Sequence, residues 1–332
     1  MFSYSYYSKY GFVIPNLFRD LHTTEMLKQV QHDTLSNKKG VIMKKQVETV
    51  LAPPAPHMVG DGFRVHNFFP AGYGLGLKRM SPFFLMDYNS KIEFPPTEQP
   101  RGVGVHPHRG FETVTIAYHG KVAHHDSAGN SGVIGEGEVQ WMTAASGVLH
   151  KEYHEKEYSR KGGPFQMVQL WVNLPAKYKM TPPKYQAVTV PAMGKYELPD
   201  GKGEVRVVAG EFKGIKGGAS TFTPIHMLNF YLKAGAKIDF ELPENYNTGA
   251  LVVEGNIQVN EHVATADHFV LFKNKGTEVS IQAETDAVVL LLSGEPIDEP
   301  VVAYGPFLMN TKEEIIQAYD DVNQGKFGYL EE

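Results

Sequence analysis

The sequence predicts an all-β fold, and two observations support this prediction. From about Val59 onward, short apolar runs alternate with groups of Gly, Pro and Asn, at the spacing of strands joined by turns in a barrel or sandwich. No long stretch in this region places apolar residues at the three-to-four-residue spacing of an amphipathic helix until the C-terminal end. At 332 residues with 42% hydrophobic content, the chain is long enough for two such domains.

The first half of the chain contains the expected strands of one domain. The last of them, Phe165–Leu174, is apolar on both faces, which indicates a central strand covered on either side. Gln169 is its polar member, and we interpret this side chain as a cap for a buried carbonyl rather than as part of a pocket. The expected strands are Phe63–Phe69, Phe83–Met86, Thr113–Tyr118, Val133–Trp141 and Phe165–Leu174.

A segment rich in Pro and Lys, residues 176–191, is expected to link the two halves. The N-terminal domain then spans residues 59–175 and the C-terminal domain residues 192–332. The second domain should end in a short amphipathic helix, Asn310–Gly325, with Asn310 or Thr311 as its cap. Its expected strands are Gly203–Ala209, Ala219–Leu232, Ala250–Val259, His268–Phe272, Glu278–Ala283 and Ala287–Ser293.

Composition excludes several classes of protein. A net charge of -5 argues against direct nucleic-acid binding, which normally requires a basic face. No apolar run approaches the roughly 18–20 residues that span a bilayer, so no membrane segment is expected. The chain has no cysteine, which excludes disulfides, thiolate metal sites and iron–sulfur clusters. Any metal must be held by His, Asp, Glu or carbonyl groups, and the missing thiols fit a cytoplasmic location.

Residues 1–42 differ in composition from the rest of the chain. They are rich in Tyr, Lys and Gln, and they lack the basic start, apolar core and cleavage site of a signal peptide. We interpret them as an appended extension or a mis-assigned start, disordered or loosely docked. Because residues 43–46 (MKKQ) resemble a natural bacterial start, a chain that begins at Met43 is expected to keep its metal content and thermal stability.

Two pairs of residues indicate a metal site. His106 and His108 are two positions apart, so in a strand they share one face, with Cα atoms roughly 6–7 Å apart. His150 and Glu152 repeat this spacing. Two such strands facing each other across a small barrel would bring together three imidazoles and one carboxylate, a ligand set for a divalent transition metal. Imidazole suits Fe, Ni, Cu or Zn, and the carboxylate oxygen favours Fe or Mn.

A second carboxylate competes with Glu152 for the metal. Glu112 is expected on the same strand face as His106 and His108, where it would be either the ligand or a group that orients an imidazole. We prefer Glu152, because it shares a face with His150 whereas Glu112 would lie roughly 13 Å along the strand from His108.

Other histidines are interpreted without a metal role. His124 and His125 are adjacent, so in a strand they would point to opposite faces, and we interpret them as part of a solvated turn with Asp126.

Four motifs resemble the pirin family of bicupins over roughly Val59 to Gly328. They are HPHRGFETVTI, QWMTAASGVLHKE, QLWVNLP and GPFLMNTKEEIIQA. The resemblance implies two stacked cupin β-barrels with one mononuclear metal ion, held only in the N-terminal barrel. The implied ligands match His106, His108, His150 and Glu152. The second half has no H-x-H motif, since His262 and His268 stand alone, which is consistent with a C-terminal barrel without metal.

The resemblance also implies a function. The pirin family implies iron(II) as the metal, with Mn, Ni, Cu, Co or Zn as alternatives. Bacterial pirins also resemble quercetin 2,3-dioxygenases in site geometry, which implies a flavonol-like substrate opened by dioxygen. In that enzyme Glu152 would serve as both ligand and base. Phe111, Trp141 and Met142 would either line the approach or belong to the core.

Two other functions remain open. Eukaryotic pirins are linked to transcription cofactor roles in the nucleus, so the rival hypothesis is a metal-binding regulatory or redox-sensing protein without turnover, recognised by a protein partner. A cupin isomerase or sugar-modifying enzyme ranks last, because such enzymes favour a looser ligand set and a more polar pocket.

Overall fold

The computed structural model describes residues 43–332, and the interpretation of residues 1–42 as an extension concerns residues outside this range. Within the described range the prediction of an all-β fold is confirmed. Helical structure there is confined to short segments, and no helix of the described chain has the length and apolar character needed to cross a membrane. These segments are α2 (Lys156–Lys161), α3 (Lys312–Asn323), and the 3-10 helices η1 (Ala176–Tyr178) and η2 (Val190–Ala192).

The first barrel consists of two sheets. The larger has the strand order β12-β9-β6-β11-β4-β3-β2, and the smaller has the order β5-β10-β7-β8. Side chains of the smaller sheet reach those of the larger, since Thr115 on β6 donates to Glu152 on β10. The strands are β2 (His57–Val59), β3 (Phe63–Phe69), β4 (Phe83–Phe94), β5 (Gly102–His108), β6 (Phe111–His119), β7 (Val122–Asp126), β8 (Ser131–Ile134), β9 (Val139–Thr143), β10 (Val148–His154), β11 (Gly163–Asn173) and β12 (Lys184–Val188).

The second barrel repeats this arrangement. Its larger sheet has the order β1-β22-β19-β24-β17-β14-β13, and its smaller sheet has the order β18-β23-β20-β21. A two-stranded ribbon, β15–β16, lies beside them. The strands are β1 (Val47–Leu51), β13 (Gly194–Glu197), β14 (Gly203–Ala209), β15 (Glu211–Phe212), β16 (Ile215–Lys216), β17 (Ile225–Leu232), β18 (Lys237–Glu241), β19 (Asn247–Glu254), β20 (Asn256–Val259), β21 (His262–Thr265), β22 (Phe269–Phe272), β23 (Glu278–Ala283) and β24 (Ala287–Gly294).

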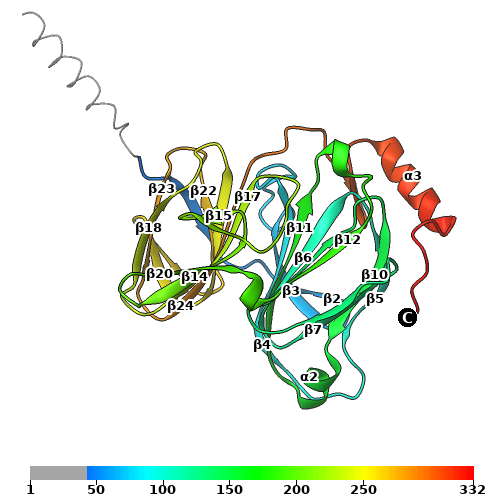
Figure 1. Ribbon diagram of the computed structural model, residues 1–332, viewed down its shortest axis with the longest axis horizontal. Helices are drawn as coiled ribbons and strands as arrows, with labels where there is room; N and C mark the ends of the chain where they lie inside the picture. Colours follow the sequence, from blue (N-terminus) through cyan, green and yellow to red (C-terminus); the bar gives the residue numbers. More distant parts are fainter. Residues whose placement is uncertain (1–42) are drawn as a thin grey trace, which may run out of the picture. The chain divides into compact units, whose positions relative to one another are not determined.

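The two barrels exchange terminal elements. Strand β1 precedes the first barrel in sequence, yet it pairs antiparallel with β22 of the second. The hairpin of β25 (Val302–Tyr304) and β26 (Phe307–Met309), with helix α3, follows the second barrel but packs on the first (Figure 1). Arg109, just after β5, forms an ion pair with Asp321 of α3 at 2.8 Å. The helix that we expected at the end of the C-terminal domain therefore contacts the N-terminal barrel.

The expected strands match the structure at most positions. Strands β3, β14 and β23 have the expected bounds, and β11 lies between β6 and β4, as expected for a central strand. The single expected strand Val133–Trp141 is wrong: it is two strands, β8 and β9, separated by a turn in which Glu138 N donates to Gly135 O. The expected strand Ala219–Leu232 begins only at Ile225.

Helix α3 begins as its sequence predicts. Thr311 is the N-cap and accepts a hydrogen bond from Glu314 N, while the Glu314 side chain accepts from Thr311 N, which completes a capping box. Residues 176–191, the expected linker, are partly ordered as β12, which pairs with β9 at the edge of the larger sheet of the first barrel.

The apolar core is continuous across the two barrels. One buried cluster combines Phe68, Trp141 and Leu170 of the first barrel with Phe269 and Leu290 of the second. Hydrogen bonds join the barrels through buried tyrosines: Tyr118 Oη donates to Asn229 Oδ1 at 2.7 Å, and Tyr88 Oη donates to Asp267 Oδ1 at 2.6 Å.

Lys179 ties the β25–β26 hairpin to the first barrel. Its buried ammonium donates to Gly110 O at 2.7 Å, Asn173 Oδ1 at 2.6 Å and Leu308 O at 2.8 Å. Replacing Lys179 with Met leaves three buried acceptors without this donor, and each costs on the order of 1–3 kcal/mol. We expect Lys179→Met to lower the free energy of unfolding by several kcal/mol in urea titrations. Lys177→Met, two residues away on an exposed side chain, should change it little. Equal stability of the two variants would contradict the role of Lys179.

Candidate metal centre

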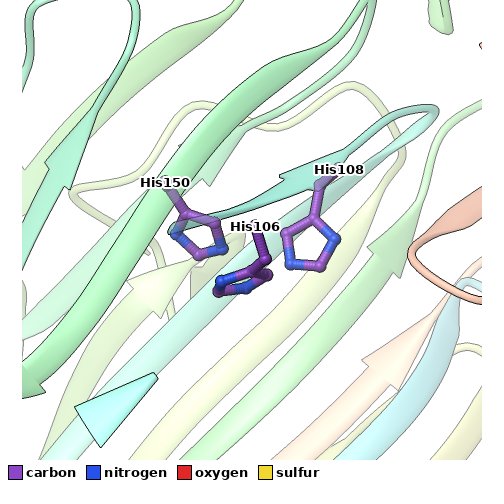
Figure 2. Close-up of side chains that lie close together, drawn as sticks. All are labelled: His106, His108 and His150. Atoms are coloured by element: carbon purple, nitrogen blue, oxygen red, sulfur yellow. The ribbon is translucent and has the colours of Figure 1, made fainter. Parts of the chain in front are cut away.

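Strands β5 and β10 bring the three predicted imidazoles together. The two strands are antiparallel neighbours, and their register places His106 directly opposite His150. They are adjacent in one sheet, so the expectation that they face each other across the barrel is wrong. The ring centroids of His106 and His150 are 4.2 Å apart, and His108 lies 4.8 Å from each (Figure 2).

Backbone carbonyls fix the orientation of two of these rings. His106 Nδ1 lies 2.8 Å from Gly104 O, and His108 Nδ1 lies 3.1 Å from Pro306 O in the turn of the β25–β26 hairpin. Because a carbonyl only accepts, Nδ1 of each ring carries a proton, and in the neutral form of histidine Nε2 then keeps its lone pair. His150 Nε2 is buried without a hydrogen-bond partner among the described residues. An unpaired buried nitrogen is costly, and a metal ion would satisfy it, so these residues fit such an ion.

Burial keeps the imidazoles of His108 and His150 neutral. Burial first, and the neighbouring His106 second, lower the pKa of His108 to about 3. The same causes, with His108 and His124, hold the pKa of His150 well below its usual value. Metal ions bind the neutral form of histidine, so both rings are ready to coordinate at neutral pH without releasing a proton.

Glu152 lies beside His150 and is held by three donors. Its buried carboxylate accepts hydrogen bonds from Thr115 Oγ1 at 3.0 Å, Gln169 Nε2 at 2.5 Å and Gln140 Nε2. Two sets of side chains place possible ligand atoms within 4.8 Å of one another. One set consists of His106, His108 and His150, and the other of His124, His150 and Glu152. The three imidazoles are therefore brought together, with Glu152 adjacent through His150.

The interpretation of Gln169 as a cap for a carbonyl is wrong. Its amide faces the cavity and donates to the Glu152 carboxylate. Gln140 and Thr115, which sequence reasoning missed, complete this set of donors. A signal was present, since Gln140 and Gln169 are amides within otherwise apolar strands, but their shared partner becomes evident only when β9, β6 and β11 are neighbours in the sheet.

The placement of Glu112 on the same strand as His106 and His108 is also wrong. The chain turns at Gly110, where φ is 91°, a conformation that favours glycine. Glu112 therefore lies on β6 in the larger sheet, where its carboxylate accepts from Thr143 Oγ1 at 2.7 Å. It belongs to neither group of metal-capable side chains among the described residues.

Glu112 gives a test of buried charge that is separate from the metal. Burial raises its pKa to about 7, despite the hydrogen bond from Thr143. The folded protein therefore keeps this proton to a higher pH than the unfolded chain does. The stability that this provides is complete below about pH 4.5 and is lost as the pH rises to about 7.

Glu112→Gln removes this titration. We expect the free energy of unfolding of the wild type, relative to that of the variant, to fall by on the order of 3 kcal/mol across this window. Urea unfolding at a series of pH values measures the difference. A constant difference between the two proteins would show that Glu112 titrates normally.

A cavity of about 320 Å³ opens beside the imidazoles. Most of its wall is apolar, and the polar groups are concentrated at the histidines, Glu152, Gln169 and Asp87. Burial raises the pKa of Asp87, which accepts a hydrogen bond from Asn67. The lining residues are Val59, Phe63, Val65, Asp87, Val103, His106, His108, Glu152, Met167, Gln169, Trp171, Gly305 and Pro306.

The aromatic residues that we considered for the approach belong to the core. Trp141 and Met142 are buried in apolar clusters, and neither lines the cavity. The ring centroid of Phe111 lies 4.2 Å from that of Trp171 and 5.0 Å from that of His108. Phe111 therefore packs against two residues of the cavity wall without lining the cavity itself. Trp171 and Phe63 are the aromatic residues that line the cavity.

The interpretation of His124 as part of a solvated turn is wrong. His124 and Asp126 lie on β7 with their side chains buried, and the ring of His124 is 5.4 Å from that of His150. The expected alternation holds, because His125 points to the other face and hydrogen-bonds Tyr153 Oη at 3.2 Å.

The interior of the second barrel is filled by apolar side chains. Its buried cluster includes Phe230, Phe240 and Leu291. His262 is exposed on β21, and His268 Nδ1 lies 3.0 Å from Ala266 O. Among residues 43–332, both groups of metal-capable side chains lie in the first barrel.

Two consecutive β-barrels, with histidines clustered inside the first, define a bicupin. Comparison with family models is specific: residues 62–172 match the pirin domain, and residues 227–328 match the pirin C-terminal cupin domain. The chain belongs to the pirin family. The predicted family and the predicted bicupin architecture are thereby confirmed.

Similar proteins carry two kinds of name. A protein of Pseudomonas aeruginosa named "Putative quercetin 2,3-dioxygenase" is 46% identical over 271 residues, which cover 82% of this chain and 94% of that protein. Pirin-1 of Arabidopsis thaliana is 38% identical over 282 residues, covering 81% of this chain and 90% of Pirin-1.

Solved structures share the fold. The crystal structure of a quercetin 2,3-dioxygenase from Acinetobacter baumannii has a TM-score of 0.82 and 45% identity, covering 87% of this chain and all of that one. The Escherichia coli pirin YhhW, solved with nickel(II), has a TM-score of 0.56 and 20% identity, covering 75% of this chain and all of its own, and at that identity the likeness concerns the fold alone.

Proposed function

We propose that this protein is a metal-dependent dioxygenase of the quercetin 2,3-dioxygenase type, which opens the ring of a flavonol-like substrate with dioxygen and releases carbon monoxide. His106, His108, His150 and Glu152 would hold one divalent metal ion, with iron(II) as the first candidate. The observation that carries this proposal is the meeting of three imidazoles at the polar end of an apolar cavity, one of them with a buried Nε2 that has no hydrogen-bond partner among the described residues.

The shape and chemistry of the cavity support a flat, largely apolar substrate. Phe63, Met167 and Trp171 provide an apolar wall, and a volume of about 320 Å³ suits one small aromatic molecule. The names of the relatives from Pseudomonas aeruginosa and Acinetobacter baumannii point to the same substrate class.

Residues of this chain would prepare the substrate. The bound ion would supply Lewis acidity and a place for dioxygen to react. Glu152 would take the proton of the flavonol 3-hydroxyl, since it is the carboxylate nearest the imidazoles in the cavity. Gln140 and Gln169 would hold that carboxylate in place through their hydrogen bonds. The apolar wall would exclude water from the opened ring.

The 3-hydroxyl gives the most direct test. Iron-loaded protein should consume oxygen with flavonols that carry a free 3-hydroxyl beside the carbonyl, because the reaction needs an acidic hydroxyl next to a second oxygen. Flavones without this hydroxyl should give no uptake above the rate of protein without metal. An oxygen electrode, combined with detection of carbon monoxide, measures both rates.

Failure of this test has a defined meaning. If iron-loaded protein consumes no oxygen with any free 3-hydroxyflavonol while still binding metal stoichiometrically, the dioxygenase proposal is wrong. The alternative of a metal-binding regulatory or redox-sensing protein, recognised by a protein partner, would then replace it.

A further inference from the structure

Strand β7 places two buried polar residues, His124 and Asp126, next to His150 on the neighbouring strand. The register of β7 and β10 pairs Asp126 with His150 and His124 with Glu152. Because alternate residues of a strand share a face, His124 and Asp126 both point toward the interior, as His150 and Glu152 do. Their side chains are 0% and 1% exposed. Such polar groups are kept in an interior only with hydrogen-bond partners.

These side chains form a chain of contacts that ends at His150. His124 Nε2 lies 3.1 Å from Asp126 Oδ2, and His124 Nδ1 lies 3.5 Å from His150 Nδ1. The second distance is at the long end for a hydrogen bond. The ring of His124 is held flat against Tyr185, with centroids 5.0 Å apart and an interplanar angle of 19°.

The direction of the hydrogen bonds follows from Asp126. Its Oδ1 accepts from Ala128 N at 3.0 Å and Asn130 N at 2.9 Å, and both of its oxygens accept from Asn130 Nδ2. The other contacts of this carboxylate are all with N–H donors, so it acts as an acceptor toward His124 as well, and His124 Nε2 carries the proton.

This assignment determines the tautomer of His150. In the tautomer with its proton on Nε2, His124 presents a lone pair at Nδ1, which accepts from His150 Nδ1–H. His150 Nε2 then keeps its lone pair, in agreement with the absence of a hydrogen-bond partner for this buried nitrogen among residues 43–332. His106 and His108 obtain the same tautomer from backbone carbonyls, whereas His150 obtains it from side chains that mutation can change.

We propose that His124 and Asp126 are positioning residues, which hold the His150 ring in the Nδ1–H tautomer with Nε2 free to bind a metal ion. The inference rests on the proposed metal centre. Side chains that orient a ligating imidazole typically contribute ten- to a hundred-fold to metal affinity.

Variants with defined hydrogen-bonding ability test this proposal, with cobalt(II) as the probe. Asp126→Asn places an amide donor where Oδ2 accepts, which favours the reverse tautomers of His124 and His150. We expect roughly ten- to a hundred-fold weaker cobalt(II) binding and a changed visible spectrum. His124→Phe should have a similar effect, because it keeps the ring on Tyr185 and removes the acceptor. His124→Gln should restore much of the affinity, because its amide oxygen can accept from His150.

His125→Gln is the matched control, since the adjacent side chain points to the other face. Circular dichroism and melting curves establish that each variant is folded. If His124→Phe and Asp126→Asn bind cobalt(II) as tightly as His125→Gln and with the same spectrum, the positioning role is refuted while the metal centre stands. Wild-type protein that binds no cobalt(II), zinc or iron refutes the metal centre and the positioning role together.

A measurement on the wild-type protein avoids mutation. Nitrogen-15 NMR of the histidine rings in the zinc-loaded protein reports which nitrogen carries each proton. We expect the proton on Nδ1 of His150 and on Nε2 of His124. A proton on His124 Nδ1 would overturn the proposal, whatever the variants show.

Discussion

Protein in which His106 and His150 are both replaced by alanine should contain no stoichiometric metal and still be folded. The two residues are paired on the neighbouring strands β5 and β10, and their ring centroids are 4.2 Å apart. Replacing both therefore removes two of the three clustered imidazoles. A remaining His108 with one carboxylate is a poor site for a divalent ion. Elemental analysis after loading with iron(II) or nickel(II) under identical conditions measures the loss.

The fold should survive because its stability comes from elsewhere. The buried apolar clusters that fill both barrels include neither histidine. The matched control is His262→Ala with His268→Ala, which also removes two imidazoles, but from the second barrel, where His262 is exposed. The control should keep the metal content of the wild type. Stoichiometric metal in the first variant, or its loss in the control, would mean that the ion binds elsewhere.

The parts of the site that the sequence predicted share a simple geometric basis. His106 with His108, and His150 with Glu152, are pairs at the two-residue spacing of a strand, so each pair marks one face without knowledge of the fold. The inward face of β7 could have been recognised in the same way, because His124 and Asp126 are also two positions apart. That signal was hidden by His125, because adjacent polar residues are also typical of an exposed turn.

The remaining errors arose from pairing, which local pattern does not determine. Glu112 follows the HPH motif by four residues, yet Gly110 turns the chain and places it in the other sheet. Gln140 and Gln169 are 29 positions apart in the sequence and lie on different strands, yet both donate to one carboxylate on a third strand. The position of β1 in the second barrel and of α3 on the first depends on contacts between distant segments, such as Arg109 with Asp321. No periodicity of a single segment encodes such contacts.

Glu152→Gln should separate binding from turnover. The substitution keeps the size of the side chain and one oxygen that can bind a metal ion, but it removes the negative charge and the proton acceptor. We expect oxygen uptake with a 3-hydroxyflavonol to fall by about 10²- to 10⁴-fold, the usual contribution of a general base. Metal content should fall far less, because His106, His108 and His150 remain.

The hydrogen bonds of Glu152 determine how this experiment must be controlled. Gln140 and Gln169 both donate to the Glu152 carboxylate, so in Glu152→Gln the NH2 group of the new amide lies against one of these NH2 donors. Because this contact can destabilise the fold, the melting temperature is measured together with the rate. Glu112→Gln is the matched control: it is the same substitution at another buried carboxylate, one that lies outside the cavity, and it should keep the wild-type rate. A Glu152→Gln protein that turns over as fast as this control would exclude Glu152 as the base. A folded variant that loses its metal in proportion to its activity would instead show that Glu152 is a ligand only. The proton of the 3-hydroxyl would then have to move to another acceptor. Asp87 is the other carboxylate that lines the cavity.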